Sequence, residues 1–413
     1  MSKDYKNISS QQAMALEDQY GAHNYHPIPV VLSKGEGVFL WSPEGKRYFD
    51  FLSAYSAINQ GHCHPRLVAI TREQAGILTL TSRAFYNNWL GPFEEKMTKL
   101  FGYDKILPMN SGAEGVETAL KLARRWGYDV KIVSPDKAKI IVCENNFHGR
   151  TTTIIGFSTD PESRGGFGPF TPGFVVIPYG HPEALRSAID DNTVAFLVEP
   201  IQGEAGVNVP PDGYLKACRE ICTKSKVLMI ADEIQTGLCR TGRMLACDYE
   251  GVGPDILILG KALSGGFMPV SAVLADDEIM LTIKPGQHGS TFGGNPLACR
   301  IAMEAMDILI EEKLADNANK MGELFRSELS KMNSPMVKTI RGKGLLNAMV
   351  IEPFKVKGET KAAWDVCLGL AENGLLAKPT HDHIIRFAPP LVITKEQINE
   401  SVDIIKRTLK HFE

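Results

Sequence analysis

Short apolar runs alternate regularly with stretches of helical spacing between Lys105 and Ala275, and this alternation constrains the fold more than any other feature of the chain. Runs of this length are typical of strands buried on both faces. Their alternation with helices predicts a mostly parallel sheet covered by helices. We therefore expect an α/β fold with a large domain built on a seven-stranded sheet, its strands at 105–109, 139–143, 174–177, 194–198, 227–231, 256–259 and 270–275.

The pattern changes from about Leu297 onward and predicts a second, smaller α+β domain. A long amphipathic helix broken near Asp316 is followed by a strand pair around 337–352, a helix at 360–373 and a closing helix from Lys395. We expect residues 1–50 to form an N-terminal arm and a segment of the small domain. The large domain then spans residues 51–296 and the small C-terminal domain residues 297–413.

Composition excludes several classes of function. The formal net charge of −3 over 413 residues offers no basic surface for nucleic acid or membranes. The eight cysteines have no metal-ligand spacing, and His62 and His64 have no acidic partner nearby in sequence, so we predict no metal site. The first residues lack the apolar core of a signal peptide. We predict a cytoplasmic protein, with the mitochondrial matrix as the alternative if a presequence has been removed.

A lysine follows one of the predicted buried strands directly. The run Ile256–Leu259 is followed by Gly260 and Lys261, and then by a turn with two glycines. An ammonium group at the end of a buried strand is costly unless it has a partner or a function. A lysine that loses its charge becomes a nucleophilic amine, which can form a Schiff base with an aldehyde. From this stretch alone, an ordinary surface lysine explains the pattern equally well.

A carboxylate at the end of a second buried strand favours the catalytic interpretation. Asp232 follows the run Val227–Ala231, and Gln235 lies just beyond it. Side chains at the carboxyl ends of strands in an open α/β sheet face the ligand crevice. A lysine for an aldehyde and an aspartate for a pyridinium nitrogen are the two groups that pyridoxal phosphate requires of its protein. The alternative for Asp232 is a helix cap or an ordinary ion pair.

Two further stretches supply candidate ligands for anions. Ser111 and Glu114 fit a capping box, so the backbone of Gly112 and Ala113 at a helix N-terminus can bind a phosphate group. This turn has neither the Walker nor the GxGxxG pattern, which counts against nucleotides. Arg386 interrupts an apolar run and therefore needs an acidic partner or an anionic ligand.

The loop after the 139–143 strand carries Phe147 and Arg150, and the loop after the 194–198 strand carries two acids, Glu199 and Glu204. Phe147 can stack on a flat ring and Arg150 can bind a carboxylate. A core phenylalanine and a surface arginine are the simpler explanation when this stretch is taken alone.

Seven motifs together resemble the fold-type I, class III pyridoxal phosphate-dependent aminotransferases. They are YGAHNYHPIPV at 20–30, SAYSAINQGHCHP at 53–65, VEPIQGEAGV at 198–207, ADEIQTG at 231–237, LGKALSGG at 259–266, HGSTFGGNP at 288–296 and GLLAKPTH at 374–381. The resemblance covers nearly the whole chain from Tyr20. The first two motifs narrow it to the branch that transfers the δ-amino group of L-ornithine to 2-oxoglutarate by a ping-pong cycle, giving L-glutamate 5-semialdehyde and L-glutamate.

The resemblance implies a role for each matching residue and a homodimer with active sites at its interface. Lys261 is expected to bind the cofactor covalently and to move the proton, and Asp232 to pair with the ring nitrogen. The other expected cofactor contacts are Gln235 at the ring hydroxyl, Phe147 on the ring face, and Ser111, Gly112, Ala113, Ser290 and Thr291 at the phosphate, the last two from the partner subunit. The expected substrate contacts are Tyr25, Tyr55, Arg150, Glu204 and Arg386.

The resemblance also implies why the substrate site contains both Glu204 and Arg386. An uncovered Arg386 would attract the α-carboxylate of ornithine and present the wrong amine, so Glu204 is expected to cover it until 2-oxoglutarate competes. One departure leaves the substrate open, because His148 after Phe147 is a pattern of acetylornithine aminotransferases. The alternatives are acetylornithine or 4-aminobutyrate transamination, a cofactor-free binding protein, and a decarboxylase or racemase.

Overall fold

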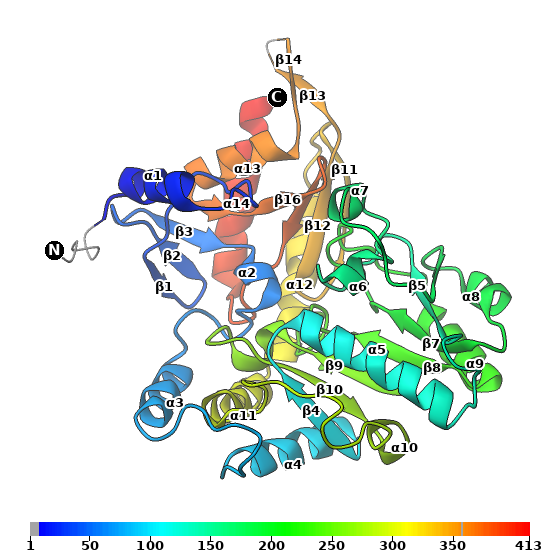
Figure 1. The fold of residues 1–413 in the computed structure, drawn as a ribbon. Helices are drawn as coiled ribbons and strands as arrows, with labels where there is room; N and C mark the ends of the chain where they lie inside the picture. Colours follow the sequence, from blue (N-terminus) through cyan, green and yellow to red (C-terminus); the bar gives the residue numbers. More distant parts are fainter. Residues whose placement is uncertain (1–7, 357) are drawn as a thin grey trace.

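The seven predicted strands form one sheet in the computed structural model, which describes residues 8–356 and 358–413 (Figure 1). Their order is β4-β10-β9-β8-β7-β5-β6, and only β10 runs antiparallel to its neighbours. The predicted mostly parallel α/β architecture is therefore confirmed. The strands are β4 (Lys105–Met109), β5 (Lys139–Cys143), β6 (Phe174–Ile177), β7 (Thr193–Val198), β8 (Leu228–Asp232), β9 (Ile256–Leu259) and β10 (Ser271–Ala275).

Helices cover both faces of this sheet, which explains why its strands are apolar without alternation. In β7, Val194 and Leu197 pack with helix α5 (Gly112–Asp129), whereas Phe196 and Val198 pack with α9 (Tyr214–Ser225) on the opposite face. The other helices before the second domain are α1 (Ser10–Tyr20), α3 (Pro65–Ala75), α4 (Leu90–Phe101), α6 (Thr152–Ile155), α7 (Pro161–Arg164), α8 (Pro182–Ala188) and α10 (Asp277–Met280), with 3-10 turns at Ala246–Tyr249 and Lys261–Ser264.

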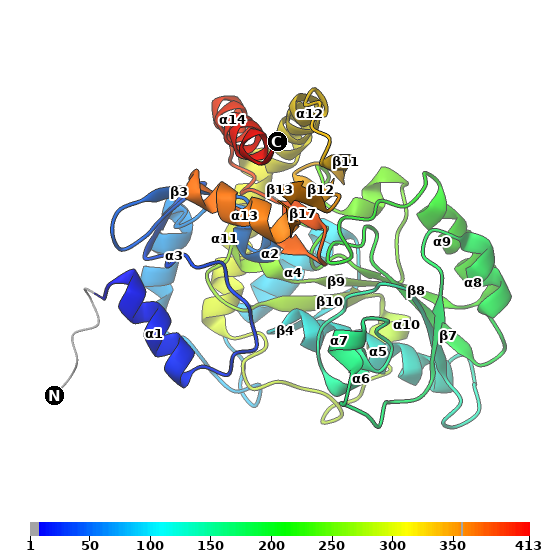
Figure 2. The same ribbon diagram turned by 90° about the horizontal axis from the view of Figure 1, so that it is seen from above.

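The C-terminal part is built on an antiparallel sheet of order β11-β12-β17-β16. Its strands are β11 (Val337–Lys343), β12 (Leu346–Ile351), β16 (Lys378–Thr380) and β17 (Ile384–Phe387). Figure 2 shows α12 (Leu314–Ser330) and α14 (Lys395–Phe412) side by side above this sheet. A separate four-stranded sheet is formed by the N-terminal strands β1 (Lys34–Glu36), β2 (Phe39–Trp41) and β3 (Arg47–Asp50) with β15 (Leu375–Leu376), which pairs with β3.

The predicted break of the long helix near Asp316 is confirmed: Lys313, whose backbone is left-handed (φ 53°), divides it into α11 (Pro296–Glu311) and α12. One local prediction in this part is wrong. The predicted 360–373 helix begins only at Ala363, as α13 (Ala363–Glu372). The residues before it form β14 (Glu359–Lys361), which is held by antiparallel pairing with β13 (Phe354–Val356). The three domain boundaries remain a prediction.

A left-handed helical turn, α2 (Ser53–Ser56), lies between the N-terminal strands and the large sheet. Its four residues have φ values of 49°, 47°, 60° and 71°. The buried carboxylate of Asp50 accepts hydrogen bonds from the backbone N–H groups of Leu52 and Ser53 at 2.9 and 2.8 Å, and its second oxygen pairs with His62 Nε2 at 2.7 Å. One carboxylate therefore holds the start of a turn that is unfavourable for L-residues.

His64, the second histidine of this stretch, pairs with Glu312. Both histidines thus have a carboxylate partner that lies far away in sequence or on another element. Across the described residues, no group of three or more histidine, cysteine or acidic side chains is arranged to hold a metal ion. Over the same residues, every helix is too short or too polar to cross a lipid bilayer.

Candidate active site

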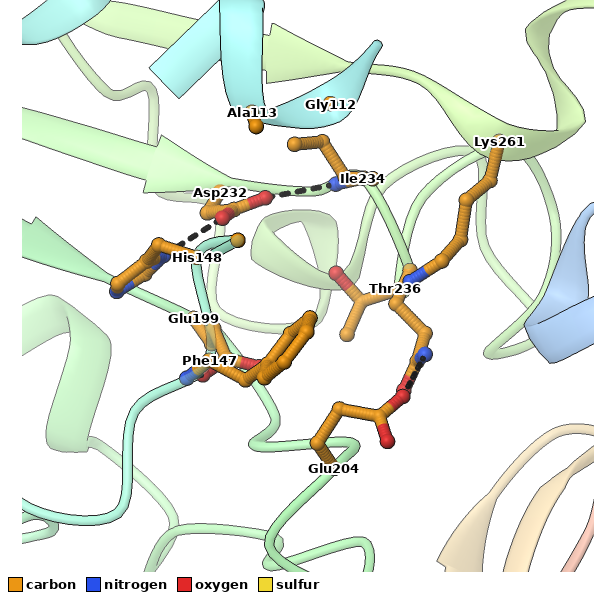
Figure 3. Close-up of a pocket in the computed structure, with 12 residues that line it drawn as sticks. Gly112, Ala113, Phe147, His148, Glu199, Glu204, Asp232, Ile234, Thr236 and Lys261 are labelled. Carbon is orange, nitrogen blue, oxygen red and sulfur yellow. Dashed lines mark hydrogen bonds and ion pairs between the residues drawn. The ribbon is translucent and has the colours of Figure 1, made fainter. Parts of the chain in front are cut away.

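A cavity of about 190 Å³ opens at the carboxyl edge of the large sheet (Figure 3). Parallel strands bring the loops that follow β5, β7, β8 and β9 to this one edge, together with the N-terminus of α5. The structure thereby gathers most of the predicted cofactor residues in one place. The cavity is lined by Gly112, Ala113, Phe147, His148, Gly149, Glu199, Glu204, Asp232, Ile234, Gln235, Thr236 and Lys261.

Lys261 extends its side chain into this cavity from the turn after β9 (Figure 3). Its backbone is left-handed, with φ 44°. Burial lowers the pKa of the ammonium, while the negative charge of Glu204 opposes this shift. A lysine with a lowered pKa is uncharged more often and is a better nucleophile at neutral pH. The position and environment of Lys261 therefore differ from those of an ordinary surface lysine.

Asp232 is buried in the wall of the cavity and makes two hydrogen bonds. Its Oδ1 accepts from the backbone N–H of Ile234 at 3.1 Å, and its Oδ2 pairs with His148 Nδ1 at 2.6 Å (Figure 3). Burial alone would lower the pKa of His148, but the hydrogen bond and charge of Asp232 outweigh it and raise the pKa. His148 therefore fixes the carboxylate, a role that the sequence did not indicate.

The residues present fit pyridoxal phosphate. Lys261 offers an amine for its aldehyde, and Asp232 offers a carboxylate for its ring nitrogen. The first N–H groups of α5 at Gly112 and Ala113 have no partner within the helix and can bind its phosphate. Gln235 Oε1 and His148 Nε2 are buried polar atoms without a protein partner among the described residues. A polar ligand in the cavity would satisfy such atoms.

A Cβ atom on residue 112 would lie 3.1 Å from Ile234 Cδ1. Glycine at this position avoids that close contact at the start of α5. The Ser111 hydroxyl, which was expected at the phosphate, accepts from the N–H of Glu114 and so completes the predicted capping box. Ser290 Oγ accepts a hydrogen bond from Asn110 Nδ2 at 2.8 Å beside the same helix start. Thr291 is exposed and does not line the cavity of its own chain. Its predicted role in a partner's site stays a prediction.

Glu199 is a second group that the sequence did not single out as a site residue. Its carboxyl oxygens accept from the backbone N–H groups of Phe147 at 2.8 Å and Gly203 at 3.4 Å, which joins two loops of the cavity wall. The side chain is buried, and burial raises its pKa to about 7. It is therefore only partly ionised near neutral pH, where an ordinary glutamate is fully charged.

Glu204 and Arg386 form an ion pair at the mouth of the cavity, with Oε1 and Nη1 2.6 Å apart. Burial would raise the pKa of Glu204, but the charges of Arg386 and Lys261 and the hydrogen bonds from Arg386 and Gln235 together outweigh it and lower the pKa to about 2. Gln235 Nε2 donates to the same oxygen at 3.0 Å, so in this structure its amide contacts Glu204. The ring of Tyr55 lies 5.2 Å from the guanidinium carbon of Arg386.

A second cavity of about 590 Å³ adjoins the first and shares Phe147 and Glu204 with it. Arg150 lines this second cavity, and its guanidinium lies 5.8 Å from the ring of Phe147. Tyr25 is exposed on the N-terminal arm and does not line either cavity. The structure thus brings Arg150, Tyr55, Glu204 and Arg386 to the mouth. Tyr25 lies next to this group, with the ammonium of Lys378 5.5 Å from its ring.

The class III aminotransferase family model matches residues 20–409 of the chain. The chain belongs to the class III aminotransferases. This family uses pyridoxal phosphate, in agreement with the groups that line the cavity. Among its relatives is "Ornithine aminotransferase, mitochondrial" of Drosophila melanogaster, which is 63% identical over 97% of this chain and 92% of its own length.

Two solved structures show the same fold at high identity. The ornithine aminotransferase from Toxoplasma gondii is 50% identical, with a TM-score of 0.95, over 98% of this chain and 96% of its own. An acetylornithine aminotransferase from Elizabethkingia anophelis is 56% identical, with a TM-score of 0.88, over 98% of this chain and 100% of its own. The fold is thus the same in both, while the substrates in their names differ.

Proposed function

We propose that this class III aminotransferase moves the δ-amino group of L-ornithine to 2-oxoglutarate by a ping-pong cycle. The observation that carries the proposal is the Glu204–Arg386 ion pair at the mouth of the cavity that holds Lys261 and Asp232. A carboxylate-binding arginine that can be covered and uncovered serves an enzyme that accepts two differently shaped substrates in turn. A racemase or decarboxylase has no use for it, because it binds one amino acid in one orientation.

Pyridoxal phosphate, when bound, supplies an aldehyde that captures amines and a ring that withdraws electrons from the substrate carbon. The Nζ of Lys261 would hold the cofactor covalently and, once the substrate amine has replaced it there, would be free to take the proton from the carbon that bears the δ-amine. Asp232 would hold a proton at the ring nitrogen, and His148 keeps that carboxylate oriented. Phe147 lines both cavities, and its ring would stack on the face of the cofactor ring.

Substrate orientation follows from the charges at the mouth. While Glu204 covers Arg386, the exposed guanidinium of Arg150 is the cation available to the α-carboxylate of ornithine, with Tyr25 and Tyr55 beside it. The α-amino end then stays at the mouth and the δ-amine points toward Lys261. In the second half of the cycle, 2-oxoglutarate presents a carboxylate that displaces Glu204 from Arg386.

Acetylornithine transamination is the second candidate. His148 beside Phe147 and the 56% identical structure named as an acetylornithine aminotransferase favour it. The relative from Drosophila, named as an ornithine aminotransferase, and the aromatic rings of Tyr25 and Tyr55 favour ornithine, because an acetylated amine would crowd against these rings. 4-Aminobutyrate fits less well, since it has no α-amino group to use Tyr25.

We also propose a homodimer in which Ser290 and Thr291 of one subunit approach the phosphate bound by the other. The exposed position of Thr291 supports this arrangement. For the compartment, we keep the cytoplasm as the first expectation. The word "mitochondrial" in the name of the Drosophila relative supports the matrix alternative.

The test is a half-reaction of the purified holoenzyme with L-ornithine alone, followed by the absorbance of the bound cofactor. Glutamate 5-semialdehyde should appear and be trapped, and 2-oxoglutarate should then restore the starting spectrum and yield glutamate. Tyr55→Ile should weaken ornithine turnover relative to other amines. Faster turnover of N-acetylornithine or 4-aminobutyrate than of ornithine by the unmodified enzyme would overturn the assignment.

A further inference from the structure

Lys378 is a cation beside the Glu204–Arg386 pair that the predicted cycle does not use. It lies in β16, directly opposite Arg386 of β17 in the antiparallel register. Residues that face each other in this way project their side chains from the same face of the sheet. Two residues further along β16 and thus on that face, Thr380 Oγ1 donates to the backbone carbonyl of Glu204 at 2.5 Å. One face of the sheet therefore carries Arg386, Lys378 and the anchor of Glu204.

The ammonium of Lys378 lacks a partner charge. Within residues 8–356 and 358–413, no carboxylate oxygen lies within 4.0 Å of it, and it lies 5.5 Å from the ring of Tyr25. Burial lowers the pKa of Lys378, the positive charge of Arg386 lowers it further, and the charge of Glu204 partly offsets both effects. The half-buried ammonium of Lys378 thus lies near Arg386, whose partner carboxylate, Glu204, is already engaged in an ion pair.

Displacement of Glu204 from Arg386 creates a second unpaired charge. The Glu204 side chain is only 25% exposed, and a carboxylate that loses its partner in such a place is costly. Its backbone stays tied to Thr380, so only the side chain is free to turn. An ammonium on the same face of the sheet is the available counter-charge.

We propose that Lys378 receives the carboxylate of Glu204 when a substrate carboxylate occupies Arg386. The inference rests on the proposed two-substrate cycle and adds where the carboxylate of Glu204 goes when it leaves Arg386. Before the exchange, Glu204 neutralises Arg386 and Lys378 is unpaired. After the exchange, the substrate neutralises Arg386 and Glu204 neutralises Lys378, so no charge is left without a partner. Lys378 acts here through Glu204 and is a positioning residue.

The test compares Lys378→Met, which keeps the length and apolar stem, with Lys378→Arg, which keeps the charge. Lys378→Met should raise the KM for 2-oxoglutarate about five-fold or more, because the open state of the switch loses an ion pair worth about 1 kcal/mol. The KM for ornithine should change less than two-fold, since Glu204 remains on Arg386 in that half-reaction. Lys378→Arg should restore most of the affinity for 2-oxoglutarate.

A double-mutant cycle separates this role from direct binding of the substrate. In a Glu204→Gln background there is no carboxylate to receive, so Lys378→Met should have no further effect on the KM for 2-oxoglutarate. An equal increase in both backgrounds would show that Lys378 binds 2-oxoglutarate itself and would overturn the proposal, as would an unchanged KM in the single variant. Absence of ornithine turnover in the unmodified enzyme would instead refute the proposed function.

Discussion

Replacement of Ala54 by glycine tests the left-handed turn that carries Tyr55. Ala54 has φ 47° and is exposed, so its methyl group fills no cavity. An L-residue in this conformation costs about 1–2 kcal/mol, which glycine does not pay. Glycine loses about 0.5–1 kcal/mol more conformational entropy on folding. We therefore expect Ala54→Gly to raise the free energy of unfolding by about 0.5–1 kcal/mol.

Ala57 provides a matched control three residues away. Its backbone is right-handed, with φ −89° and ψ −21°, so glycine there loses the entropy and gains nothing. Ala57→Gly should lower the free energy of unfolding by about 0.5–1 kcal/mol. For a chain of 413 residues the two variants should then melt about 1–2 °C apart in thermal unfolding of the apoenzyme. Equal destabilisation by both substitutions would refute the left-handed turn.

Three other substitutions test the site. His148→Phe removes a hydrogen bond to the buried carboxylate of Asp232, which is worth about 1.5–3 kcal/mol. It should raise the Kd for pyridoxal phosphate at least ten-fold in a fluorescence titration. His148→Asn retains an N–H donor and should raise this Kd less. Glu204→Gln removes the charge that competes for Arg386 and should lower the KM for 2-oxoglutarate about ten-fold. Products of transfer from the α-amine of ornithine should also appear in chromatography. An unchanged product ratio would contradict the proposal that Glu204 covers Arg386. Lys261→Ala should reduce turnover by roughly 10³-fold or more and abolish the mass that borohydride reduction adds to the unmodified enzyme; full turnover would contradict its role.

The sheet and the positions of Lys261 and Asp232 were predictable because they follow from where the buried strands begin and end in the sequence. Strands covered on both faces appear in the sequence as unbroken apolar runs, and a residue that follows a parallel strand lies at the carboxyl edge of the sheet. Lys261 and Asp232 both lie at or just beyond the end of such a strand. Their meeting in one cavity therefore required no knowledge of side-chain packing.

The contacts of His148 and Glu199 could not be predicted because they join loops that are distant in sequence. His148 and Asp232 are 84 residues apart, and neither spacing nor composition pairs them. The pKa of Glu199 depends on how completely its loops exclude water, which only the packed structure defines.

The left-handed turn at Ser53–Ser56 was missed for a different reason. Positive φ is usually signalled by glycine, and none of these four residues is glycine. The hairpin before α13 was missed because Glu359–Lys361 is short and polar, as the first turn of a helix often is. Its strand character comes from its partner strand, β13.

The raised pKa of Glu199 gives a pH dependence that isolates one buried group. In the folded protein its pKa is about 7, against an ordinary value of 4.5, so between these values the folded state binds a proton that the unfolded state has released. Stability must therefore fall as pH rises through this window, by about 3 kcal/mol in all.

Glu199→Gln replaces the carboxyl group with an amide that does not titrate. In urea unfolding, the free energy of unfolding of this variant relative to the unmodified protein should therefore rise by about 3 kcal/mol from pH 4.5 to pH 8. Glu144→Gln, at an exposed acid of the neighbouring loop, should show no such trend. A stability difference for Glu199→Gln that stays constant with pH would mean that Glu199 is already ionised in the folded protein, and the two loops it joins would then be held by a charged carboxylate.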